Sequence, residues 1–163
     1  MIRVLLSLLL LGAPAAYAYD ANGVELGARE ADVKVKFPSI RCKPLEWKSD
    51  AADRRCDAAK IPFAGVQSRV TFFLRNDAIQ AFDVRFEMKD LNKVAAFLKS
   101  RYGQPLAEAT EVISRPEKAD RKVYKLRWEK GADKAILTAQ LEKKTVTLEV
   151  QRGNFENEIY RVK

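Results

Sequence analysis

The acids and the two cysteines are the residues of this sequence that could do chemistry. The chain contains no histidine, so the commonest general base and the commonest metal ligand are missing. It also contains neither a G-x-S-x-G nor a G-x-G-x-x-G pattern. Catalysis by two carboxyl groups on either side of a cleft, as in glycosidases, stays open. Two pairs could serve, Asp83 with Glu87 and Glu156 with Glu158.

The cysteines are Cys42 and Cys56. Their spacing is not C-x-x-C, and no histidine is present to complete a zinc site, so a structural disulfide is favoured over a reactive or metal-binding pair. A disulfide that closes a loop of this length stabilises a protein by roughly 3 kcal/mol in the chain-entropy model. The residues predict no metal site, no cofactor and no catalytic residue.

The first 18 residues are typical of a cleaved signal peptide. Arg3 is followed by an apolar run from Val4 to Leu11, and Ala16-Tyr17-Ala18 matches an A-x-A cleavage site. We therefore expect the mature chain to begin at Tyr19. The apolar run is too short to cross a bilayer, and no cysteine lies near the cleavage site to carry a lipid anchor. The sequence predicts a periplasmic or secreted protein without a membrane span.

Residues 19–163 have the length of a single domain. Because Arg3 is the one charged residue of the signal peptide, its removal lowers the formal net charge from +8 to +7. The bases are interspersed with acids and no five Lys or Arg are consecutive, so nucleic acid is not an expected partner. A protein or a cell-envelope component is expected instead, although such a charge can also serve solubility alone.

Hydrophobic periodicity predicts the elements that would position these residues. Alternation over 66–87 indicates a hairpin that turns at Asn76-Asp77, and the pattern from Asp90 to Tyr102 indicates a helix. We expect a shorter helix over 28–37 and an irregular loop over 39–65 with a helical turn near 50–59. Further strands are expected at 111–114, 122–129, 135–141 and 145–150.

These elements predict an α+β fold. Two helical segments would pack on one face of an antiparallel sheet of five or six strands. The pattern of 70–87 is similar to that of 135–152, and each hairpin follows a helix. A tandem helix–hairpin repeat with units 24–88 and 89–152 is therefore one interpretation, and a chance match of amphipathic elements is the other.

The segment Leu26-Gly27-Ala28-Arg29-Glu30-Ala31-Asp32-Val33 resembles the L-G-x-[ST]-x-x-[DE]-V opening of small exported bacterial proteins with the beta-lactamase-inhibitor-protein-like fold. Outer-membrane-assembly lipoproteins of the SmpA/OmlA type are similar. The resemblance implies a short helix followed by an antiparallel sheet, whose concave face receives a protein partner in the inhibitor family. The lipoprotein role is not expected, because the chain has no lipobox cysteine.

The outer face of the sheet is the expected binding surface, together with the loop closed by the disulfide. Aromatic and arginine side chains are typical interface anchors. The predicted partner-binding residues are Trp47, Phe73, Arg75, Arg85, Lys125 and Arg127. The alternatives are a face that only meets solvent, a Phe73 covered by the tail around Phe155 and Tyr160, and a Trp47 that packs beside the disulfide.

The expected function is that of an exported, non-catalytic binding protein with a protein or cell-envelope partner. One alternative is a hydrolase of cell-wall sugar that uses paired carboxylates. The other is a periplasmic small-molecule carrier, which would need an apolar pocket between the helices and the sheet.

Overall fold

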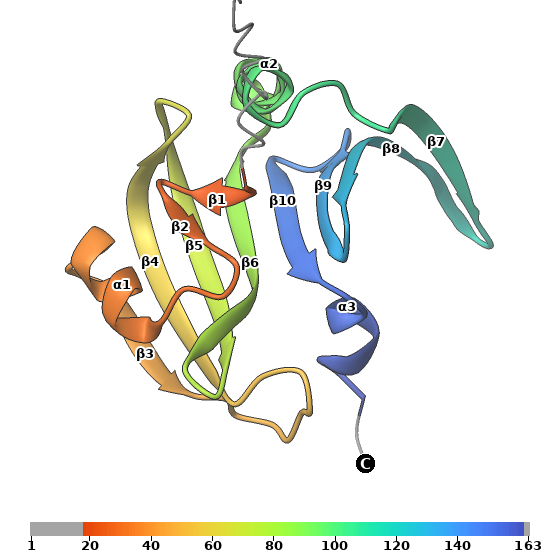
Figure 1. Cartoon of the computed structure of the whole chain (residues 1–163). Helices are drawn as coiled ribbons and strands as arrows, with labels where there is room; N and C mark the ends of the chain where they lie inside the picture. Colours follow the sequence, from red (N-terminus) through yellow and green to blue (C-terminus); the bar gives the residue numbers. More distant parts are fainter. Residues whose placement is uncertain (1–17, 162–163) are drawn as a thin grey trace, which may run out of the picture.

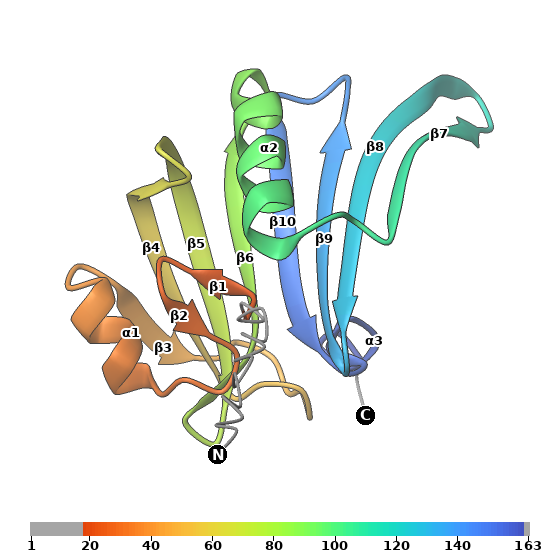
Figure 2. The ribbon, with the colours of Figure 1, turned by 45° about the horizontal axis from the view of Figure 1, so that its top comes forward.

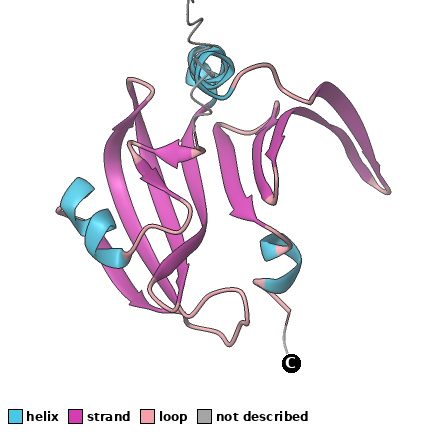
Figure 3. Ribbon diagram, viewed as in Figure 1, coloured by secondary structure: helices cyan, strands magenta, loops and turns pink. Residues whose placement is uncertain are grey.

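Strands dominate the protein, as Figure 3 shows. The computed structural model describes residues 18–161, so nearly all of the predicted signal peptide lies outside the described residues. The short strands β1 (Asp20–Ala21) and β2 (Val24–Glu25) pair with each other. The other eight form one antiparallel sheet in the order β3-β4-β5-β6-β10-β9-β8-β7 (Figure 1).

The strands of the large sheet are β3 (Arg41–Pro44), β4 (Arg54–Phe63), β5 (Val66–Arg75), β6 (Ala78–Glu87), β7 (Ala107–Arg115), β8 (Lys118–Lys130), β9 (Asp133–Gln140) and β10 (Thr145–Arg152). The helices are α1 (Glu30–Lys36), the 3-10 turn η1 (Met88–Asp90), α2 (Leu91–Tyr102) and α3 (Phe155–Glu158).

The large sheet consists of two halves of four strands each. β3 to β6 form one meander after α1, and β7 to β10 form the other after α2. The halves join where β6 pairs with β10, and we call this pairing the seam. The unit that recurs in the topology is therefore a helix followed by four strands, and not the helix–hairpin that we expected.

One face of the sheet carries the main core. Its side chains alternate with those of the other face, and Phe72, Phe82, Leu126 and Leu148 are fully buried on it. Val33 of α1 and Val94 and Leu98 of α2 join the same cluster. Figure 2 shows α2 lying over β6 and β10. The helix ends at Gly103, whose φ of 84° is available to glycine without strain.

The predicted hairpins are confirmed. β5 and β6 are joined by the two-residue turn Asn76-Asp77, whose φ values of 48° and 62° are those of a type I′ turn. The three alternating segments in the second half of the sequence form β8, β9 and β10 as an antiparallel meander.

The α+β prediction is wrong, because the chain forms eight strands in one sheet and little helix. Segment 39–65 is not a loop but contains β3 and β4, and 50–59 has no helical turn. β4 was hidden by a bulge between Ala58 and Ile61, which interrupts the alternation that reveals a strand. α1 has seven residues, and α2 is the one longer helix among the described residues.

The tail that the sequence left unassigned forms α3 on the opposite face of the sheet from α1 and α2. Within residues 18–161 no helix has the length and the apolar character needed to cross a membrane.

Candidate functional site

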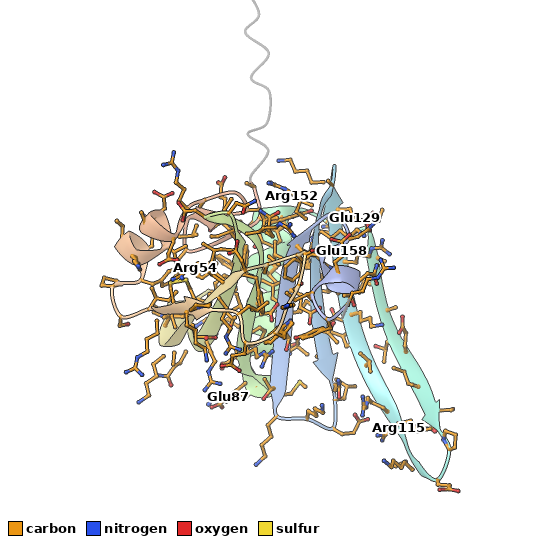
Figure 4. The ribbon with its side chains drawn as sticks, turned by 90° about the horizontal axis from the view of Figure 1, so that it is seen from below. Arg54, Glu87, Arg115, Glu129, Arg152 and Glu158 are labelled. Carbon is orange, nitrogen blue, oxygen red and sulfur yellow. A yellow bond between two sulfur atoms is a disulfide. The ribbon has the colours of Figure 1, made fainter. Side chains whose placement is uncertain are left out.

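The face of the sheet opposite the main core, which we call the open face, is partly covered at one end. The loop 45–53 and α3 lie over it and form a second apolar cluster with the sheet. Its buried members are Ala51, Ala52, Phe73, Ala81, Phe155 and Ile159. Figure 4 shows α3, marked by Glu158, lying across the sheet, with Arg115 at the far tip of the β7–β8 hairpin.

The segment Phe155–Tyr160, which we call the latch, is tied to the loop 45–53. Trp47 Nε1 donates a hydrogen bond to the carbonyl oxygen of Ile159 at 2.8 Å. The indole ring stacks on Tyr160 with 5.6 Å between ring centroids, and Ser49 Oγ donates to the carbonyl oxygen of Glu158 at 3.2 Å. Phe155 contacts Phe73 of β5 at 5.5 Å between centroids. Trp47 therefore holds the latch in place.

The predicted disulfide is confirmed and lies at the base of this loop. Cys42 in β3 and Cys56 in β4 are directly opposite each other and are bonded. Ligand atoms of Glu30 lie within 4.8 Å of both sulfurs. Because the two sulfurs are bonded to each other, neither is a thiolate that could bind a metal there.

Two carboxyl groups face each other across the seam. Asp83 in β6 and Glu149 in β10 are paired residues of neighbouring strands, and both side chains belong to the open face. Burial and, secondarily, Glu149 raise the pKa of Asp83 to about 7, while Arg85 opposes the shift with Nη2 at 3.7 Å from Asp83 Oδ2. Burial and then Glu156 raise the pKa of Glu149. We call Asp83 and Glu149 the acid pair.

The acid pair and the latch enclose a hollow of about 350 Å³. Phe73, Phe155 and Ile159 supply apolar walls, and Glu156 of α3 adds a third carboxyl group to the acid pair. An apolar hollow with a few converging polar groups is the usual form of a ligand site.

Two more hollows extend the open face. One of about 300 Å³ is lined by Lys125 and Arg127, and the other of about 530 Å³ by Arg85 and Lys143. Both are also lined by Glu149, so the three hollows surround this one residue. In the larger one, Gln140 Oε1 is the one buried side-chain oxygen or nitrogen without a hydrogen-bond partner in the described part of the chain.

The structure brings only some of the predicted partner-binding residues to a surface. Arg85, Lys125 and Arg127 line the open hollows, although Lys125 pairs with Glu111 at 2.9 Å and Arg127 pairs with Glu129. Phe73 is buried at 7% exposure beneath the latch, and Trp47 is half-buried. Arg75 lies next to the turn of the β5–β6 hairpin and lines none of the three hollows.

The predicted acid pairs are not those of the structure. Glu87 forms an ion pair with Lys89 at 2.7 Å, and the partner of Asp83 is Glu149 instead. Glu156 lines the hollow, whereas Glu158 does not. The importance of Glu149 was missed because β6 and β10 are distant in sequence. Only a correct pairing of the two strands could have revealed it.

Comparison with known proteins yields little. No family model and no curated protein matches the chain. Among solved structures, the chain is similar to a DUF4309 family protein (YjgB) from Bacillus subtilis subsp. subtilis str. 168. The identity is 12%, the match covers 86% of this chain and 84% of that chain, and the TM-score is 0.34.

Proposed function

We propose that this protein is an exported binding protein that receives a protein of the periplasm or cell envelope on the open face of its sheet. The observation that carries the proposal is the set of three hollows around Glu149. Their walls combine aromatic rings with Arg85 and Arg127, residue types that anchor interfaces. The predicted signal peptide and the Cys42–Cys56 disulfide support a compartment where disulfides persist.

Site-specific crosslinking in the native envelope tests this proposal. A photoreactive residue at Ile136 or Thr138 of β9 lies in the open hollows, whereas one at Val35 of α1 is exposed on the other side of the molecule. We expect a defined protein to crosslink at the first two positions and not at the third. No crosslink at the open face, or the same products at Val35, would reject the proposal.

A matched pair of triple variants locates the contacts. Replacing Arg85, Lys125 and Arg127 by alanine removes three positive charges from the open face. The control removes three positive charges from exposed bases elsewhere, Lys36, Lys118 and Lys144. Recovery of the crosslinked partner should fall at least tenfold in the first variant and stay unchanged in the control. Equal recovery from both variants would remove these bases from the site.

A second candidate function is hydrolysis of a cell-wall sugar. The observation that favours it is the acid pair, because a carboxyl group with a pKa near 7 can act as a general acid beside a second carboxyl group. Release of reducing ends from peptidoglycan would fall at least 100-fold in Asp83→Asn and in Glu149→Gln, and would persist in the control Glu87→Gln. A wild-type protein that releases no reducing ends would exclude this candidate.

A small-molecule carrier was the third expectation. It would hold its ligand between the helices and the main face of the sheet. That space is occupied by Leu98 of α2, Leu126 and Leu148, which are fully buried in one cluster. We therefore do not propose a carrier.

A further inference from the structure

The latch fits the hollow through its apolar side chains. Phe155 and Ile159 are buried against Phe73 and Ala81 of the sheet, and Phe155 forms a tilted aromatic pair with Phe73. Such a pair stabilises a contact beyond the burial of apolar area. An aromatic anchor is therefore a good occupant of this end of the open face.

The latch brings an acidic side chain into a hollow that is already acidic. Glu156 lines the same hollow as the acid pair, and its Coulomb repulsion is among the effects that raise the pKa of Glu149. Gln151 accepts a hydrogen bond from the backbone N–H of Glu156 at 2.8 Å and donates one to Glu156 Oε2 at 3.3 Å, but it carries no charge. Arg85, beside Asp83, is the one base paired with these three acids among the described residues. An acidic hollow thus lies in a chain whose net charge is +8.

The latch is also held by few interactions. α3 has four residues, and Tyr160 next to it is 71% exposed. The ties to the loop are the hydrogen bonds from Trp47 and Ser49 and the stacking of Trp47 on Tyr160. Short segments held by few contacts open at a small fraction of the free energy of global unfolding.

We propose that the partner enters this hollow as a short peptide segment with an aromatic residue followed by a basic one, and that it displaces the latch. This inference rests on the proposed function and names the chemistry of the partner. The aromatic residue replaces Phe155, and the basic residue stands where Glu156 stands now. A guanidinium group there meets the two carboxyl groups of the acid pair, and a planar guanidinium can donate two parallel hydrogen bonds to a carboxylate.

Two synthetic peptides test the proposal on the full mature chain. One copies residues 154–160, Asn-Phe-Glu-Asn-Glu-Ile-Tyr, and the other carries Arg at the third position. Binding is followed by tryptophan fluorescence, because Trp47 contacts the latch. We expect the Arg peptide to bind at least tenfold more tightly, and Asp83→Asn with Glu149→Gln to abolish the difference. Equal affinity of the two peptides for the wild-type chain would overturn the proposal.

A pair of variants within the chain gives a second readout. Glu156→Arg places a base in the hollow, whereas Glu158→Arg makes the same charge change outside it. We expect Glu156→Arg to slow hydrogen exchange of residues 155–160 at least threefold and to weaken binding of the Arg peptide. Glu158→Arg should change neither. Identical behaviour of the two variants would overturn the charge argument.

The outcomes separate the two proposals. Crosslinks at Ile136 or Thr138 together with peptides that bind equally would reject the basic segment and keep the open face as the binding surface. Tight binding of the Arg peptide without crosslinks in the envelope would keep the chemistry of the hollow and reject the proposed function.

Discussion

Asp83 has a pKa far above the ordinary value of an aspartate side chain. Its pKa rises from 3.8 to about 7, so between about pH 4 and pH 7 the folded chain holds a proton that the unfolded chain has lost. The free energy of unfolding therefore falls as the pH rises through this range and levels off above it. A shift of this size corresponds to a loss on the order of 4 kcal/mol.

Asp83→Asn should largely remove this pH dependence. Asparagine keeps the shape of the side chain and cannot ionise, so the variant should be more stable than the wild type at pH 8 and similar to it at pH 5. Urea unfolding at pH 5, 6, 7 and 8 measures the effect. Asp57→Asn is the control, since Asp57 lies in the same cross-sheet row but is paired with Arg55 and Thr71. It removes a carboxylate from the same row but outside the acid pair, and a pH profile unchanged in Asp83→Asn would contradict the assignment.

The two tryptophans provide a matched test of the latch. Each donates a hydrogen bond from Nε1 to a backbone carbonyl at 2.8 Å, Trp47 to Ile159 and Trp128 to Gly103. Trp47→Phe should cost about 1 kcal/mol. Because this cost falls on the latch, hydrogen exchange of residues 155–160 should accelerate about fivefold.

Trp128→Phe removes an equivalent bond in the main core and should leave exchange in the latch unchanged. The prediction fails if the two variants accelerate exchange in the latch to the same extent.

At the scale of elements, the sequence predicted those strands that have one buried face and one more exposed face. β5, β6, β9 and β10 alternate buried and exposed positions, and the turn at Asn76-Asp77 has a strong local signature. β7 is exposed along nearly its whole length and offers little alternation, so the predicted strand 111–114 covers only part of its nine residues. The helix predicted over 28–37 is shorter in the structure, where α1 has seven residues. Its acids lie in the first turn and its bases in the last, as the helix dipole favours.

The candidate site could be predicted only in part, because alternation shows which face of a strand a residue lies on but not which distant segment covers it. Arg85, Lys125 and Arg127 were placed on the open face by alternation alone. The sequence left open whether Phe73 is exposed or covered by the tail around Phe155 and Tyr160. The structure shows it covered, because Phe155 of α3 packs on it. The resemblance of residues 26–33 to the inhibitor-type proteins stays a prediction.

The disulfide is an element-scale constraint on the loop that holds Trp47. Replacing Cys42 and Cys56 by serine should lower the free energy of unfolding by about 3 kcal/mol, because the unfolded chain regains the freedom of the loop. The latch should also exchange faster, since Trp47 lies inside that loop. Urea unfolding with and without a reductant measures the first effect, and an unchanged midpoint after complete reduction would refute it.

At the scale of the whole molecule, the seam makes the two halves one cooperative unit. Leu148 of β10 pairs with Val84 of β6, and both are fully buried. Leu148→Ala should lower the free energy of unfolding by about 2–5 kcal/mol. Fluorescence of Trp128 in a Trp47→Phe chain reports on the second half, and hydrogen exchange of β5 reports on the first.

We expect the two transitions in urea to coincide and to shift together in Leu148→Ala. Two separate midpoints would show that the halves unfold independently.

The seam also determines the order of folding. The hairpins β5–β6 and β9–β10 close across short turns. β6 and β10, in contrast, are separated in the sequence by α2, β7, β8 and β9. The entropy of closing so long a loop makes this pairing late. Asp83 and Glu149 therefore meet last, and refolding near pH 6 should end with the uptake of a proton, which a pH indicator in a stopped-flow experiment would record.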